Sequence, residues 1–225
     1  MDAREVLKHV DHTELMQTAK WEDIKRLCDD AVYYSTASIC IPPAYVKQAA
    51  EYLGDKMPVC TVIGFPHGYN TTACKVFEVK DAIANGAKEV DMVINIGWAK
   101  DGKFDAITEE IRALKEAAGD HILKVIIETG LLTDDEKIAL CKCVTDAGAD
   151  FIKTCTGFAA GKATPEDINL FKAHIGPNVR MKASSGMTAL DQGAVFVEMG
   201  CERLGSKLLV NIAKADGIVA DVEGY

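Results

Sequence analysis

Two lysines at the ends of short apolar runs, 29 residues apart, carry the clearest chemistry in the chain. Lys153 lies in Phe151-Ile152-Lys153-Thr154-Cys155-Thr156-Gly157, and Lys182 lies in Val179-Arg180-Met181-Lys182-Ala183-Ser184-Ser185-Gly186. If the runs are consecutive parallel strands, both ammonium groups reach the same edge of one sheet. Their repulsion then favours one neutral, nucleophilic amine, and such an amine in a pocket forms Schiff bases. A single lysine at a strand end more often reaches solvent.

Asp91 and Lys124 strengthen the case for a site because each lies in its own apolar run. With a period of two, Asp91 shares a face with Val93 and Asn95, and Lys124 shares a face with Ile126 and Glu128. A buried charge is too costly to leave unpaired, so we expect the two side chains to neutralise one another. Spacing alone supports a structural ion pair and a proton relay about equally. Schiff-base chemistry needs a group that moves protons, and Asp91 fits that need.

Short β-branched runs alternate with longer amphipathic stretches about eight times, a pattern typical of parallel α/β folds. Thr133 and Glu136 have the spacing of a capping box, and Pro165 stands at a first helical position. Gly86, Gly119 and Gly148 are expected helix stops. The predicted strands cover residues 8–11, 38–41, 59–63, 89–95, 123–127, 151–154, 180–183 and 203–205.

We predict a (β/α)8 TIM barrel formed by one domain over residues 1–225. An open doubly wound sheet is the alternative, but no G-x-G-x-x-G motif follows the first strand. Active sites of such barrels lie at the carboxyl ends of the strands, where Asp11, Thr13 and Cys40 are further candidates. Arg180 shares a face with Lys182, which is awkward in a small barrel unless Arg180 lies at the bottom rim and reaches solvent.

Composition excludes several classes of function. The net charge of -9, without a long Lys/Arg cluster, argues against a nucleic-acid partner. No apolar stretch approaches the ~20 residues that span a bilayer, so no membrane partner is expected. The N-terminus has neither a signal core nor a transit pattern, and we expect a cytoplasmic protein.

Metal ligands are not evident in the sequence. The eight cysteines are scattered through apolar segments without CxxC spacing, as expected of reduced core thiols. His9 and His12 lack a nearby third ligand, and no HxxxH or HExxH pair occurs. We therefore predict no metal.

Seven segments together resemble the deoxyribose-phosphate aldolases, a family of class I aldolases with a TIM-barrel fold. The resemblance covers nearly the whole chain and rests on Val10-Asp11-His12-Thr13-Glu14-Leu15, Ala37-Ser38-Ile39-Cys40-Ile41, Val62-Ile63-Gly64-Phe65-Pro66, residues 70–83, Val90-Asp91-Met92-Val93-Ile94-Asn95-Ile96-Gly97, Leu123-Lys124-Val125-Ile126-Ile127-Glu128-Thr129 and Asp150-Phe151-Ile152-Lys153-Thr154.

The resemblance implies that Lys153 forms the Schiff base, that Lys182 favours its neutral form, and that Asp91 with Lys124 handles the protons. It implies reversible cleavage of 2-deoxy-D-ribose 5-phosphate to D-glyceraldehyde 3-phosphate and acetaldehyde, in deoxynucleoside catabolism. Neither a metal nor an organic cofactor is implied, and a homodimer is favoured. The expected substrate-binding residues are Asp11, Thr13, Cys40, Thr156, Gly157, Ser185, Gly186, Gly205, Ser206 and Lys207. The family also allows a tail tyrosine, here Tyr225, to help transfer a proton, although a frayed end is favoured by sequence alone.

The chain departs from the family pattern where the family binds phosphate. The family reads Gly-Gly, an aliphatic residue and Arg after the seventh-strand lysine, whereas this chain has Ser185-Gly186-Met187-Thr188. After the eighth strand, Lys207 stands where small or hydroxyl residues are usual. We expect Lys207 to supply the missing positive charge, although a solvent-facing lysine at the start of the last helix is the alternative.

Three other functions remain as alternatives. An aldolase of the same family could act on other or unphosphorylated aldehydes, because the phosphate loops are altered. A catalytically silent barrel that binds sugar phosphates has the same support, but the intact lysine pair argues against it. A metal-dependent lyase would need a ligand set at the strand ends, and a chelator would distinguish it.

Overall fold

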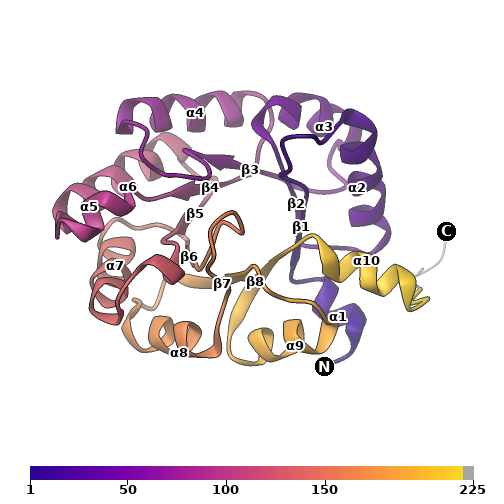
Figure 1. The fold of residues 1–225 in the computed structure, drawn as a ribbon. Helices are drawn as coiled ribbons and strands as arrows, with labels where there is room; N and C mark the ends of the chain where they lie inside the picture. The colour runs from indigo at the N-terminus through magenta and orange to yellow at the C-terminus, as the bar shows by residue number, and fades with distance from the viewer. Residues whose placement is uncertain (220–225) are drawn as a thin grey trace.

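The computed structural model describes residues 1–219, and its eight parallel strands form a closed barrel (Figure 1). Each strand pairs with the next along the chain, and β8 pairs with β1 to complete the ring. The strands are β1 (Val10–Thr13), β2 (Ser38–Ile41), β3 (Val59–Ile63), β4 (Glu89–Val93), β5 (Ile122–Ile126), β6 (Phe151–Lys153), β7 (Arg180–Ser184) and β8 (Cys201–Ser206). The predicted TIM barrel is confirmed.

Helices surround this barrel on the outside (Figure 1). They are α1 (Ala3–Leu7), α2 (Trp21–Tyr33), α3 (Val46–Leu53), α4 (Thr72–Ala84), α5 (Ile96–Lys100), α6 (Phe104–Ala118), α7 (Asp134–Asp146), α8 (Pro165–His174), α9 (Leu190–Glu198) and α10 (Leu208–Ala215), with short 3-10 turns at Pro43–Tyr45 and Thr129–Leu131. Among residues 1–219, no helix has the length and apolar character needed to cross a membrane.

Local sequence signals begin and end several of these helices as predicted. Thr133 and Glu136 form the capping box of α7, and Pro165 opens α8. Gly119 ends α6 in a left-handed conformation. These signals are local, so they act without help from the tertiary fold.

Six of the eight predicted strand ranges differ from the structure at an end, and only residues 38–41 and 59–63 agree at both ends. Two of the differences have a clear cause. The first strand is Val10–Thr13 rather than residues 8–11, because Lys8 is the C-cap of α1. The fourth strand stops at Val93, because Asn95 caps α5 by accepting a hydrogen bond from the Trp98 amide at 3.2 Å. Helix caps thus displaced both boundaries.

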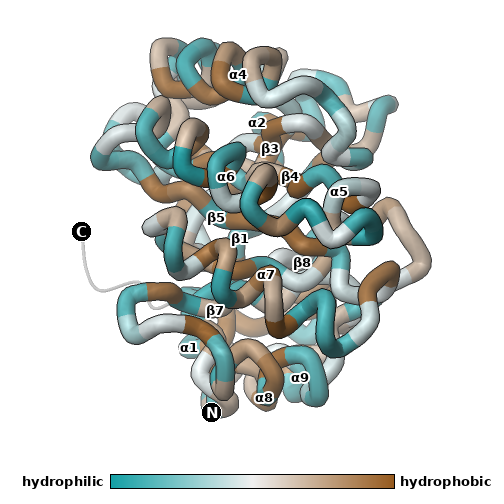
Figure 2. Tube along the Cα trace, turned by 90° about the vertical axis from the view of Figure 1, so that its left-hand side faces the viewer, coloured by the Kyte–Doolittle hydropathy of each residue, from teal (hydrophilic) through white to brown (hydrophobic). Residues whose placement is uncertain are grey.

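The strands separate an apolar outer layer from a polar interior. Outward-facing residues such as Ile39, Ile41 and Val125 are buried against the helices, and apolar and polar stretches alternate along those helices (Figure 2). Inside the barrel, the buried apolar cluster of Cys40, Cys60 and Val62 is small. Most of the hydrophobic stabilisation therefore comes from the layer between strands and helices.

Phe151 closes the lower, amino-terminal end of the barrel. Its ring is fully buried, and the guanidinium carbon of Arg180 lies 4.0 Å from the ring centroid. The Arg203 guanidinium lies 5.6 Å from the same centroid. Arg180 is about one-third exposed and faces Glu202, so it occupies the bottom rim and reaches solvent. This position resolves the awkward sharing of one strand face by Arg180 and Lys182.

A second buried charge pair ties the outer helices to the barrel. The Lys75 ammonium donates hydrogen bonds to Glu110 at 2.9 Å and to the Val93 carbonyl at 2.8 Å. Thr72 donates to the other oxygen of Glu110 at 3.2 Å. Both charged side chains are completely buried. The pair therefore connects α4 and α6 to the end of β4, two residues after Asp91.

Replacing Lys75 by Met should lower the free energy of unfolding by about 3 to 5 kcal/mol, because Glu110 would remain buried without a partner. The double variant Lys75→Met/Glu110→Leu should recover much of this loss. Urea unfolding measures both values. Lys80→Met, at an exposed position of the same helix, serves as the control and should change stability by less than about 0.5 kcal/mol. An equal loss in the single and double variants would contradict the pairing argument.

Candidate active site

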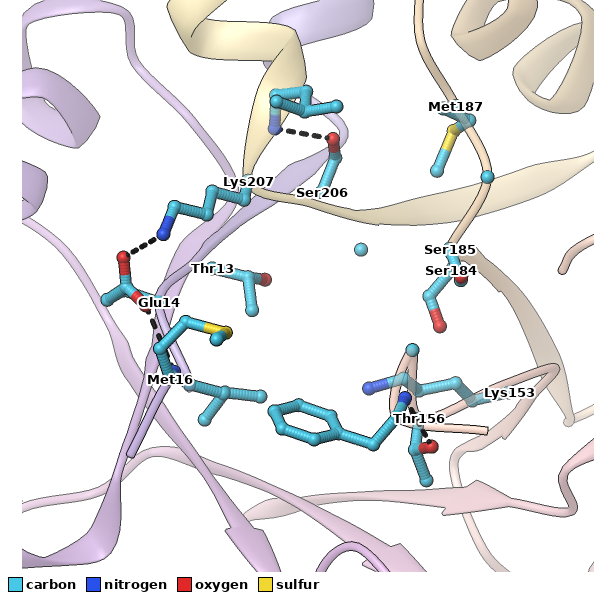
Figure 3. A pocket seen from close by; sticks show the side chains of 16 residues that line it. Thr13, Glu14, Met16, Lys153, Thr156, Ser184, Ser185, Met187, Ser206 and Lys207 are labelled. Carbon is cyan, nitrogen blue, oxygen red and sulfur yellow. Dashed lines mark hydrogen bonds and ion pairs between the residues drawn. The ribbon is translucent and has the colours of Figure 1, made fainter. Parts of the chain in front are cut away.

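A cavity of about 300 Å³ opens at the carboxyl ends of β1, β6, β7 and β8 (Figure 3). The Lys153 side chain points into it from β6, and Ser184 and Ser185 face it from the end of β7. Lys207 and Ser206 form the opposite wall, which follows β8. The cavity therefore combines one lysine at its base with hydroxyl, apolar and charged side chains around its mouth.

Beneath this cavity, Asp91 connects three lysines. Strand register makes Asp91 and Lys124 direct neighbours, and it does the same for Lys153 and Lys182. One carboxylate oxygen of Asp91 accepts from Lys124 at 2.9 Å. The other oxygen accepts from both Lys153 and Lys182 at 2.7 Å. The expected contact between Asp91 and Lys124 is confirmed, and it belongs to a larger network.

A lower layer of charges supports Lys182 and Lys124 from below. Asp11 accepts hydrogen bonds from Lys182, from Ser38 at 2.8 Å and from Arg203 at 3.1 Å. Glu89 pairs with Arg203 at 2.8 Å and with Lys124 at 2.5 Å. The side chains of this layer are nearly or completely removed from solvent, so water screens their mutual attraction only weakly.

The network fixes the charge state of its members. Burial acts to raise the pKa of Asp91, but the ammonium groups of Lys124, Lys153 and Lys182 outweigh it and hold that pKa well below its usual value. Burial acts to lower the pKa of Lys182, but the carboxylates of Asp11 and Asp91 raise it above the usual range. Lys182 therefore keeps its proton at neutral pH and remains a fixed positive charge.

Charge balance distinguishes Lys153 from its neighbours. The network joins four basic side chains (Lys124, Lys153, Lys182, Arg203) to three carboxylates (Asp11, Glu89, Asp91). One surplus positive charge thus remains when all are ionised. Of these seven groups, Lys153 alone lines the cavity, with 4% of its surface exposed. Lys153 is therefore the one amine of these seven groups that a molecule in the cavity can reach.

Most of the substrate-binding residues predicted from sequence line the cavity. They are Thr13, Thr156, Gly157, Ser185, Gly186, Gly205, Ser206 and Lys207. Two predicted members do not: Asp11 and Cys40 are fully buried and form no part of the wall. Asp11 lies too deep because its carboxylate is needed by Lys182 and Arg203, and Cys40 packs against Cys60 and Val62 inside the barrel. Tyr225 lies outside the described residues.

The surroundings of Lys207 differ from the expectation that its ammonium group is available to a phosphate. Its ammonium forms an ion pair with Glu14 at 2.5 Å, and its side chain is half exposed. Thr188, at the position where the family has Arg, donates instead toward Gln192 and does not line the cavity. The Ser206 hydroxyl accepts from the amides of Leu208 and Leu209 at the start of α10. Lys207 is thus placed at the cavity but already has a carboxylate partner.

Sequence reasoning missed several members of the site. In the charge network these are Ser38, Glu89 and Arg203, and in the cavity wall they are Glu14, Leu15, Met16, Phe158, Ser184, Met187 and Leu208. Glu89 lies two residues before Asp91 on the same strand and therefore faces the same side of the sheet. This spacing was sufficient to predict that Glu89 belongs to the network. Leu15, Met16 and Phe158 lie in loops, where no periodicity indicates which side chain turns inward.

One group of potential metal ligands occurs within residues 1–219, formed by Cys40, Cys60 and Asp91. It fits a cation poorly, because lysine ammonium groups already occupy both oxygens of Asp91. Burial also raises the pKa of the Cys60 thiol well above its usual value, which keeps it protonated. The absence of a metal stays a prediction.

Comparisons with known proteins agree with this geometry. A deoxyribose-phosphate aldolase of Clostridium botulinum is 54% identical over 225 residues, covering all of both chains. That of Clostridioides difficile is 56% identical over 94% of this chain and 96% of its own. A crystal structure of a candidate deoxyribose-phosphate aldolase from Coccidioides immitis is 39% identical and superposes with a TM-score of 0.92, covering 97% of this chain and 88% of the other.

A sequence model of the DeoC/LacD family aldolases matches residues 5–200, which include the three lysines and Asp91. With the relatives above, this match shows that the chain belongs to the DeoC/LacD family of aldolases.

Proposed function

We propose that this protein is a class I aldolase that reversibly cleaves 2-deoxy-D-ribose 5-phosphate to D-glyceraldehyde 3-phosphate and acetaldehyde. The observation that carries the proposal is the position of Lys153, the member of a buried network of lysines and carboxylates that faces the cavity. The full-length similarity to enzymes named deoxyribose-phosphate aldolase supports the substrate. The homodimer and the cytoplasmic location stay predictions.

Catalysis begins when the neutral amine of Lys153 attacks the aldehyde carbon of the open-chain sugar. Loss of water from the resulting carbinolamine gives an iminium ion, which withdraws electrons from the bond between C2 and C3. A base removes the proton of the C3 hydroxyl, that bond breaks, and glyceraldehyde phosphate leaves. The remaining enamine takes up a proton at its terminal carbon, and hydrolysis releases acetaldehyde and restores the lysine.

Asp91 is the proposed proton carrier, directly or through water, with Lys124 as its fixed counterion. In the resting network three ammonium groups hold Asp91 ionised and weakly basic. In the carbinolamine the Lys153 nitrogen is neutral, so one of those three cations is lost. Asp91 therefore takes up a proton more readily at that stage and can give it to the departing hydroxyl. When the positive charge returns in the iminium ion, the ionised carboxylate, directly or through water, removes the proton of the C3 hydroxyl.

Borohydride reduction in the presence of acetaldehyde should trap a covalent adduct on Lys153, located by peptide mass mapping. In Lys182→Met the same adduct should form only at higher pH. The reason is that Lys182, whose pKa is raised, stays cationic beside Asp91, and its removal stabilises the protonated form of Lys153. An adduct on a different lysine would refute the assignment of the nucleophile, and an unchanged pH profile in Lys182→Met would refute the role of Lys182.

Asp91→Asn should lower turnover by about 10² to 10⁴, the usual contribution of a positioned acid or base. Circular dichroism and urea unfolding measured in parallel report on folding. If Asp91 carries the proton, turnover should fall far more than the free energy of unfolding. Cys60→Ala is the control: it removes a neighbouring thiol 3.2 Å from Asp91 and should retain most of the activity. If Asp91→Asn simply unfolds, the carboxylate is a structural counterion.

Lys207→Ala should lower kcat/KM for deoxyribose 5-phosphate by about tenfold to a hundredfold, the value of a charge-assisted contact. Cleavage of unphosphorylated deoxyribose should be almost unaffected, because Lys207 acts only on the phosphate. Glu14→Gln should have the opposite effect on the phosphorylated substrate, since it frees Lys207 from its ion pair. Equal changes on both substrates would show that Lys207 does not bind the phosphate.

A further inference from the structure

Lys162 is an exposed lysine in the segment that joins β6 to α8. This segment, orange in Figure 1, extends toward the centre of the barrel in that view. It is joined to the loop after β7, because the Ala163 amide donates to the Ser185 carbonyl at 3.3 Å. The Ser185 hydroxyl in turn donates to the Gly161 carbonyl at 3.5 Å. Lys162 is therefore held next to the cavity wall formed by Ser185 and Gly186.

The aliphatic part of Lys162 packs directly on Gly186. A Cβ added to Gly186 would lie 2.8 Å from Cβ, 3.0 Å from Cδ and 3.1 Å from Cγ of Lys162. The first distance is shorter than real Cβ atoms show, and the other two are unusually tight. Gly186 also has a φ of 87°, a conformation that side chains disfavour. Gly186 thus leaves room for the Lys162 stem, which lies along the backbone of a cavity-lining residue.

Lys162 and Lys207 differ in whether the ammonium group has an ion-pair partner. Lys207 already contacts Glu14 at 2.5 Å. Within residues 1–219, the Lys162 ammonium has neither an ion pair nor a side-chain hydrogen bond. Lys162 itself does not line the cavity, but Gly186, against which its stem packs, does. The ammonium is two bonds beyond the Cδ atom that lies beside Gly186, so it is within a short reach of the cavity rim. An anion at that rim could pair with the Lys162 ammonium without first displacing a carboxylate from it.

We propose that Lys162 is a specificity-determining residue that binds the phosphate group of the substrate. This inference rests on the proposed function and adds a phosphate contact from the β6–α8 segment. The phosphate carries about -1.5 to -2 charges at neutral pH, so one half-exposed lysine already paired with Glu14 neutralises it incompletely. Lys162 and Lys207 approach from different loops and together replace the fork of donors that an arginine supplies.

The test compares cleavage of deoxyribose 5-phosphate and unphosphorylated deoxyribose by wild type, Lys162→Met and Lys162→Arg. Lys162→Met keeps the stem on Gly186 and removes the charge. It should lower kcat/KM for the phosphorylated sugar by about 5- to 10-fold and leave the unphosphorylated sugar unchanged. Inhibition by inorganic phosphate should weaken by a similar factor. Lys162→Arg should retain most of the wild-type preference.

Lys47→Met, an exposed lysine on the outer helix α3, is the matched control and should change neither substrate. An equal effect of Lys162→Met on both sugars, or no effect on either, overturns the inference while the aldolase assignment stands. A wild-type protein that cleaves neither sugar overturns the proposed function, and the inference fails with it.

Discussion

The structure depends on one buried carboxylate, that of Asp91, and on the positive charges it holds together. Three ammonium groups contact its two oxygens within 2.9 Å, inside a barrel where water screens them only weakly. Without Asp91 the lysines would repel one another, and burying them would be prohibitively costly. Below Asp91, Glu89 and Asp11 neutralise charge in the same way by pairing with Lys124 and Lys182. Asp91 thereby holds Lys153, the proposed nucleophile, at the base of the cavity.

Because the barrel interior is polar, most of the hydrophobic stabilisation comes from the layer between the strands and the outer helices. Buried aliphatic side chains of the strands pack there against helices that cover them on every side. The ion pair of Lys75 with Glu110 lies in this layer and also fixes the carbonyl of Val93, at the end of the strand that carries Asp91. Folding energy and catalytic geometry are therefore separated in space but connected through β4. Because the two are separate, the sequences of the loops at the barrel mouth can vary without destabilising the hydrophobic core.

Strand parity explains why much of the site was predictable from sequence, and why part of it was not. Asp91, Lys124, Lys153 and Lys182 stand at regular positions in apolar runs, where the period of two and the parallel register bring them together. The depth of Asp11 was not predictable, because it depends on which neighbouring lysine reaches it. The approach of Lys162 to Gly186 joins two irregular loops, and the pairing of Lys207 with Glu14 joins residues distant in the chain. No local pattern encodes such contacts.

Within residues 1–219, the buried Phe151 ring, with the guanidinium groups of Arg180 and Arg203 over it, fills the amino-terminal end of the barrel. The cavity above Lys153 opens at the carboxyl end. A group bonded to Lys153 therefore lies deeper in the cavity than a group held at its rim. In the mechanism proposed above, the two-carbon fragment stays bonded to Lys153 after cleavage, so the three-carbon phosphate leaves the mouth of the cavity first. Product release therefore follows a fixed order, and in the synthetic direction acetaldehyde must enter first.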